Sequence, residues 1–89
     1  MQTLDDYLYT LQSKGFQIGE DASGFIYFGK HYTGMSDELV IAAIEVTLKA
    51  QKAFDGSFYI SLLETFALNK INTKKEALQY IKEKELLPF

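Results

Sequence analysis

The side chains that could do chemistry in this 89-residue sequence are few, because it contains no cysteine and one histidine. Without cysteine the chain has no disulfide, thiolate zinc site or cysteine nucleophile. A catalytic triad or a histidine-based metal site would have to be built around His31, and no motif places a nucleophile or an orienting carboxylate beside it. The acidic pairs Asp5-Asp6 and Glu20-Asp21 resemble helix starts, where carboxylates complement the helix dipole. We therefore expect no enzyme activity, no metal and no cofactor.

Residues 24–30 match part of a phosphate-binding motif. They read Gly-Phe-Ile-Tyr-Phe-Gly-Lys, which fits the first seven positions of G-x-x-x-x-G-K. Such a loop needs small residues, so that backbone amides can surround the phosphates, and a Ser or Thr after the lysine to hold magnesium. Here four bulky residues fill the loop and His31 follows Lys30. Bulky apolar residues are typical of a packed core, so the sequence does not predict nucleotide binding.

The aromatic residues of the same stretch have two interpretations. Phe25, Tyr27 and Tyr32, with Lys30 and His31 among them, would form a platform for stacking single-stranded bases if their rings were exposed. Alternatively, the rings close a thin core under a glycine-rich loop. The two interpretations differ in whether the rings point outward or inward.

A second group of cations lies near the carboxyl end of the chain. Lys74 and Lys75 stand where a helix is expected to begin, and a positive charge there opposes the helix dipole, which mildly favours an acidic partner. A solvated helix face with i, i+4 ion pairs is the alternative. The candidate contacts to a partner or to nucleic acid are Phe25, Tyr27, Lys30, Tyr32, Lys70, Lys74 and Lys75.

The overall charge argues against sequence-specific DNA reading. The formal net charge is −3, and all nine cations are lysine. Arginine, which supplies bidentate contacts to phosphate and guanine, is absent. A hydrophobic content of 47% is ample for a core, but a domain this short buries only about 60% of the surface of its unfolded chain. Self-association would bury more, so a homo-oligomer is an open alternative.

The first residues, Met-Gln-Thr-Leu-Asp-Asp, are acidic where a signal peptide would be basic. The longest apolar run, residues 39–44, is six residues long, against about 20 needed to span a bilayer. We expect a cytoplasmic protein with no membrane contact.

Helical spacing of apolar residues predicts an all-α or mainly α domain over residues 1–89, a compact bundle of about four helices. The first helix starts at the cap Thr3 and ends by Gly15 after about three turns. Ser36 caps a central helix with an apolar stripe. A third helix spans about 58–69, and the capping box Thr73 to Glu76 opens a last helix that Pro88 stops. The domain thus consists of an amino-terminal part, 1–35, and a helical core, 36–85.

Residues 16–34 are the exception to this helical pattern. Five of the six glycines lie between positions 15 and 34, and each lowers helix propensity. Two apolar stretches, 17–18 and 25–28, flank the polar, glycine-bounded segment 19–24, as in a short hairpin. The sequence therefore favours a hairpin or irregular packing over a helix at 21–31.

Phe58, Leu62 and Phe66 place an aromatic, an aliphatic and an aromatic residue at successive intervals of four, and a short turn and a threonine-capped helix that starts at Thr73 follow them. This pattern is the hallmark of the C-terminal domain of DnaD-like replication proteins, which residues 36–82 resemble. The resemblance implies an all-helical module of DNA replication or phage functions that acts through DNA or protein contacts. A row with this spacing is equally typical of any helix that faces a core.

The expected function is a non-enzymatic protein-interaction module, accessory or regulatory in DNA replication. The alternative is a nucleic-acid-binding domain that uses Lys70, Lys74, Lys75 and the aromatic residues of 25–32. The first expects a protein partner, and the second expects binding that weakens with salt.

Overall fold

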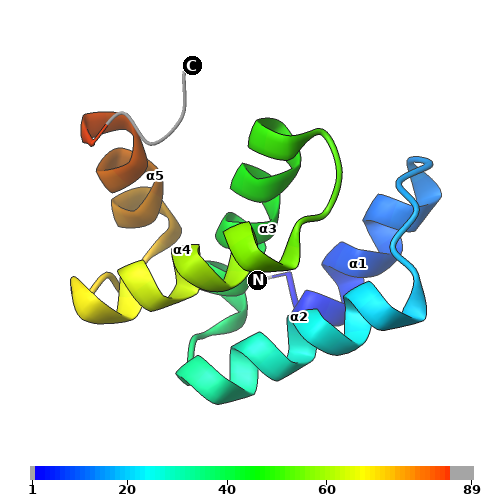
Figure 1. The fold of residues 1–89 in the computed structure, drawn as a ribbon, viewed down its shortest axis with the longest axis horizontal. Helices are drawn as coiled ribbons and strands as arrows, with labels where there is room; N and C mark the ends of the chain where they lie inside the picture. Colours follow the sequence, from blue (N-terminus) through cyan, green and yellow to red (C-terminus); the bar gives the residue numbers. More distant parts are fainter. Residues whose placement is uncertain (1, 85–89) are drawn as a thin grey trace.

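Five α-helices make up the part of the chain that the computed structural model describes, residues 2–84 (Figure 1). No strand occurs within that range. The predicted helical class is therefore confirmed, with one helix more than expected. In chain order the helices are α1 (Leu4–Ser13), α2 (Glu20–Thr33), α3 (Asp37–Gln51), α4 (Gly56–Leu68) and α5 (Lys74–Glu83).

Side-chain caps set the starts of four of these helices. Thr3, Ser36 and Asp55 each accept a hydrogen bond from the backbone N–H three residues on, at the starts of α1, α3 and α4. Thr73 does the same for α5, and the Glu76 side chain accepts from the Thr73 N–H in return, which completes the predicted capping box. The caps predicted at Thr3, Ser36 and Thr73 are confirmed. Helix α4 begins slightly earlier than predicted, because Asp55 caps it.

The segment for which a hairpin was favoured is helix α2, so that prediction is wrong. The apolar run 25–28 does not alternate between two sheet faces: Ile26 is buried in the core, while Phe28 is exposed. Gly29 lies on the buried side against α4, where a Cβ would come within 2.8 Å of the Tyr59 ring. Packing against α4 thus outweighs the low helix propensity of the glycines, as tertiary contacts commonly do.

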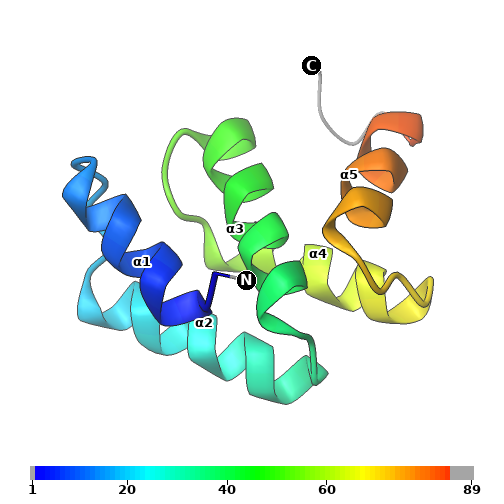
Figure 2. The ribbon, with the colours of Figure 1, turned by 180° about the vertical axis from the view of Figure 1, so that it is seen from behind.

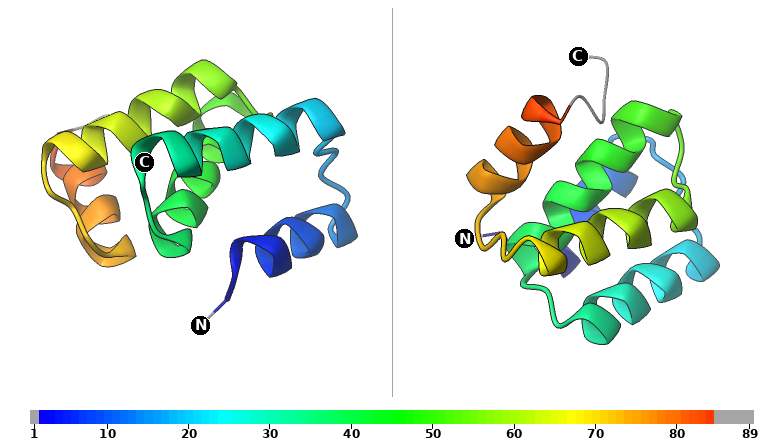
Figure 3. Two further views of the ribbon diagram at one scale, coloured as in Figure 1. Left: turned by 90° about the horizontal axis from the view of Figure 1, so that it is seen from below. Right: turned by 60° about the vertical axis from the view of Figure 1, so that its left-hand side comes forward.

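Helix α3 is the central element, as predicted, and it contacts each of the other four helices. Helices α1 and α5 lie on either side of it (Figures 1 and 2). Helices α2 and α4 pack side by side and form one layer, which the view from below shows most directly (Figure 3). The buried residues, from Leu4 in α1 to Ile81 in α5, form one continuous core.

Two carboxylates in the first turn of α3 tie it to three other helices. Asp37 accepts a hydrogen bond of 3.0 Å from the backbone N–H of Leu4 and forms an ion pair of 3.4 Å with Lys30 of α2. Glu38 accepts a hydrogen bond from the backbone N–H of Lys74, the first residue of α5. These contacts hold the starts of α1 and α5 and the end of α2 close to the start of α3.

Because two tyrosines, Tyr7 and Tyr59, are buried, we expect the fold to be less stable in alkaline solution. Burial raises the pKa of Tyr59 above its usual value of 10.0, and burial together with the charge of Glu45 raises the pKa of Tyr7. Above pH 10 the unfolded chain loses protons that the folded chain retains, so the free energy of unfolding falls by up to about 1.4 kcal/mol per pH unit for each tyrosine. Urea unfolding at pH 8 and at about pH 11 measures the loss. If the free energy of unfolding of Tyr59→Phe fell between these two pH values by as much as that of the unchanged chain, the assignment of part of the loss to Tyr59 would be contradicted.

Candidate functional site

Three aromatic rings, the aromatic row, run along one side of α2 at Phe25, Phe28 and Tyr32. The ring centroids of Phe25 and Phe28 are 5.9 Å apart. Those of Phe28 and Tyr32 are 5.5 Å apart, with the ring planes within 14° of parallel. Phe25 is half-buried, whereas Phe28 is 55% exposed and Tyr32 is 67% exposed. The row therefore starts against the core and continues onto the surface.

The buried end of the aromatic row is held by α4. The Phe25 ring meets the edge of the Tyr59 ring at a centroid distance of 6.3 Å. It also lies over Gly56, where a Cβ would come within 3.0 Å of the Phe25 ring. Tyr59 is fully buried, and its hydroxyl donates a hydrogen bond of 2.7 Å to the Ile26 carbonyl of α2. These contacts hold the Phe25 end of the row, so the Phe25 ring loses little further freedom when a partner binds.

The predicted aromatic contacts are only partly brought together. Phe25 and Tyr32 belong to the aromatic row, but Tyr27 is half-buried and packs against the core. Phe28, which links the other two rings, was predicted only as one of the aromatic residues of 25–32 and was not named singly. The interval of three and then four residues along a helix would have identified it, but the segment was expected to form a hairpin.

The predicted lysines do not form one basic surface. Lys30 is paired with Asp37. Lys74 is held twice by α3, since its backbone N–H donates to Glu38 and its Nζ lies 2.9 Å from Glu45 Oε1. The position of Lys74 at a helix start favoured an acidic partner, and the acidic groups that it contacts, Glu38 and Glu45, belong to the same chain. Lys70 and Lys75, by contrast, are exposed around the turn between α4 and α5.

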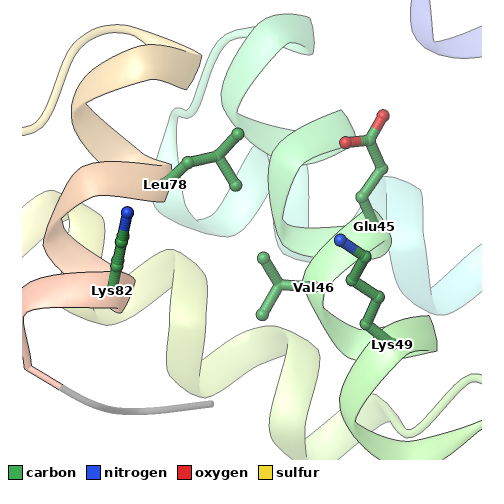
Figure 4. A pocket seen from close by; sticks show the side chains of 5 residues that line it. All are labelled: Glu45, Val46, Lys49, Leu78 and Lys82. Carbon is green, nitrogen blue, oxygen red and sulfur yellow. The ribbon is translucent and has the colours of Figure 1, made fainter. Parts of the chain in front are cut away.

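A pocket of about 280 Å³ opens between α3 and α5 (Figure 4). Val46 and Leu78 form its apolar walls, and Glu45, Lys49 and Lys82 complete the lining. Ligand pockets commonly have volumes of about 300–1,000 Å³ and bury most of the ligand. Because the volume of this pocket falls just below that range, the aromatic row is the stronger candidate site.

Residues 2–84 contain neither a cluster of metal-binding side chains nor a membrane-spanning helix. No group of three His, Asp or Glu side chains there could hold a metal ion, and His31 is exposed on α2. No helix in the described range has the length and apolar character needed to cross a membrane.

The residues that carry the family resemblance of residues 36–82 belong to the core or pack against it; they are Phe58, Leu62 and Phe66. Phe66 is fully buried, Leu62 is nearly so, and Phe58 is half-buried and packs against the core. Leu62 and Phe66 therefore stabilise the fold and offer no surface to a partner. Whether the chain is related to DnaD-like proteins stays a prediction.

Comparison with known proteins shows that a family model matches the chain. The matching family model is that of a family of unknown function, DUF6123, and it covers residues 1–87. This range includes all five helices and the aromatic row. No curated protein and no solved structure matches the chain.

Proposed function

We propose that this chain, which belongs to the DUF6123 family, is a non-enzymatic protein-interaction module whose partner docks on the aromatic row of α2. The observation that carries the proposal is the exposure of two stacked rings, Phe28 and Tyr32, on an ordered helix. A role in DNA replication and a cytoplasmic location are further parts of the proposal. They rest on the sequence alone, the first on the resemblance of residues 36–82.

Exposed aromatic rings in contact with one another favour a protein partner on physical grounds. Burying one aromatic side chain removes about 150–250 Å² from water. Tyr and Phe are accordingly enriched at the centres of protein interfaces, and Tyr is prominent among residues that dominate binding energy. The aromatic row offers Phe28 and Tyr32 side by side, so a partner can cover both with one continuous surface.

Charge favours a protein over a nucleic acid as the partner. Single-stranded nucleic acid needs cations that follow its backbone as well as rings on which its bases stack. Lys30 and Lys74, two of the four lysines predicted for that role, are engaged by carboxylates of α3. The chain as a whole carries a net charge of −3, which repels phosphate.

Site-specific photo-crosslinking in cells that produce the chain tests the proposal. A photo-reactive benzoyl-phenylalanine replaces Phe28 in one variant and Tyr9 in a control, because Tyr9 is an aromatic residue on α1 that is 73% exposed. We expect discrete protein adducts from position 28 and few or none from position 9, since only the first lies in the aromatic row. Equal adduct yields at the two positions would contradict the proposal.

A nucleic-acid function would give a different result in the same study. The purified chain would then retard single-stranded oligonucleotides in a salt-dependent way, and the double substitution Lys70→Glu with Lys75→Glu would abolish the retardation. That outcome, without protein adducts at position 28, would replace the proposed function by its alternative.

A further inference from the structure

The aromatic row is part of a longer stripe along α2 that begins at Asp21. Asp21, Phe25, Phe28 and Tyr32 follow one another at intervals of four, three and four residues, which places them on one side of a helix. The same spacing forms the contact seam of paired helices. Asp21, like Phe28 and Tyr32, is exposed. The stripe therefore has a carboxylate acceptor at one end, two phenyl rings in the middle and a hydroxyl donor at the other end.

We infer that this stripe binds the same stripe of a second copy of the chain, with the two α2 helices antiparallel. The inference rests on the proposed function, because it names the partner of the same surface. In the antiparallel register, Phe25 of each copy faces Phe28 of the other. Tyr32 of each copy then faces Asp21 of the other, where the hydroxyl can donate to the carboxylate. Each contact occurs twice, as a two-fold axis requires.

The charges along α2 select the antiparallel arrangement. Its first turn carries Glu20 and Asp21, and its last turn carries Lys30 and His31. A parallel pair would bring Asp21 against Asp21, which is unfavourable for like charges. The antiparallel pair brings the acidic first turn beside the last turn of the other copy. Lys30 is already paired with Asp37 within its own chain, so the Tyr32–Asp21 contact contributes most of this selectivity.

Gly24 provides an independent observation at the same place. It lies inside α2 one turn before Phe28, it is exposed, and a Cβ added to it would meet nothing within 4 Å. Glycine lowers helix stability relative to alanine, and no contact within the chain requires it here. A glycine beside the seam leaves room for a side chain of the second copy, because the distance between packed helices depends on the size of the side chains at the contact. The paired α2 helices thus account for a glycine that the isolated chain does not need.

The size of the surface predicts a weak dimer. Helix α2 has 14 residues, a length of about 21 Å, and one such pair is small beside stable interfaces, which bury about 1,200–2,000 Å². We therefore expect a dissociation constant in the micromolar range, so that monomer and dimer exchange at accessible concentrations.

Sedimentation equilibrium of the full chain over a range of concentrations tests the dimer. We expect a monomer–dimer equilibrium that Phe28→Ala weakens at least about tenfold, because it removes a central ring of the seam. Tyr9→Ala is the matched control, since it removes a comparably exposed ring from α1, and it should leave the dissociation constant unchanged. A chain that stays monomeric throughout, or a dimer that Phe28→Ala and Tyr9→Ala weaken equally, would overturn the inference.

The variant Gly24→Ala tests whether Gly24 takes part in the contact between the two α2 helices or affects only the stability of its own helix. In dilute solution it should raise the melting temperature of the monomer, because alanine is the better helix former and the site is open. In the same variant the dimer should weaken by about tenfold or more, because the added methyl groups hold the helices apart. A higher melting temperature with an unchanged dissociation constant would overturn the role of Gly24 in the contact.

The crosslinking experiment distinguishes failure of this inference from failure of the proposed function. Adducts at position 28 with twice the mass of the chain support the second copy as partner. Adducts of other masses, with a chain that sediments as a monomer, overturn the second copy and retain the aromatic row as a protein-binding surface. Monomeric sedimentation without adducts at position 28 overturns both.

Discussion

Tyr59→Ala is expected to lower the free energy of unfolding by about 3–5 kcal/mol, the range for removing a buried aromatic ring. The Tyr59 ring is fully buried between α2 and α4. It contacts the rings of Phe25 and Phe54 at centroid distances of 6.3 and 5.4 Å, and its hydroxyl donates to the Ile26 carbonyl. Small domains have total stabilities of about 5 kcal/mol at the low end, so the variant should be largely unfolded. Urea unfolding followed by circular dichroism measures the loss.

Two control variants assign this loss to the ring. Tyr59→Phe keeps the ring and removes the hydrogen bond, so it should cost only about 1–2 kcal/mol. Tyr9→Ala removes an exposed tyrosine ring and should change the free energy of unfolding by less than about 0.5 kcal/mol. If Tyr59→Ala cost no more than Tyr59→Phe, the ring would not be the link between α2 and α4 that its contacts indicate.

Local signals predicted most of the helix starts. A cap involves residues three apart, so Thr3, Ser36 and Thr73 could be recognised from the sequence without knowledge of the fold. Helix α2 could not be predicted in this way, because the requirement for a glycine at position 29 is imposed by α4. The atoms nearest to its missing Cβ belong to residues 59, 60 and 63, at least 30 positions away along the chain. The local sequence therefore shows the low helix propensity of glycine, but it does not show the packing of Gly29 against α4, which outweighs that propensity.

The error in α2 carried over into the candidate site. In a strand, residues at intervals of two share a face, which groups Phe25 with Tyr27. In a helix, intervals of three and four share a face, which groups Phe25 with Phe28 and Tyr32. The sequence thus identified the segment 25–32 that carries the exposed rings, but only a helical period groups Phe28 with Phe25 and Tyr32 and sets Tyr27 apart.

The lysines show a second limit of prediction from sequence. Glu45, which binds the Nζ of Lys74, lies 29 positions away along the chain. Lys30 and its partner Asp37 are on different helices. A count of seven lysines and eight acids over residues 36–89 gives the correct sign of the charge, but it cannot show which cations are engaged. Only the packing of α2 and α5 on α3 determines that.

Gly29→Ala is expected to lower the free energy of unfolding by about 1–3 kcal/mol, the usual cost of overfilling a packed core. The added Cβ would lie 2.8 Å from Tyr59 Cε2 and 3.1 Å from Ile60 Cδ1. Ile60 can shift its terminal methyl group, but the Tyr59 ring is held by its hydrogen bond to Ile26. The helix propensity of alanine offsets up to about 1 kcal/mol of the cost. Chemical denaturation of the variant measures the net loss.

The same substitution five residues earlier in α2 is the matched control for Gly29→Ala. Gly24→Ala places its Cβ in open space and should stabilise the monomer by up to about 1 kcal/mol, so the two glycines of α2 should respond with opposite signs. A double-mutant cycle isolates the cause: in a Tyr59→Phe background the ring is freed from its hydrogen bond and can move aside, so the cost of Gly29→Ala should fall. Equal costs in both backgrounds would mean that the hydrogen bond does not hold the ring against Gly29.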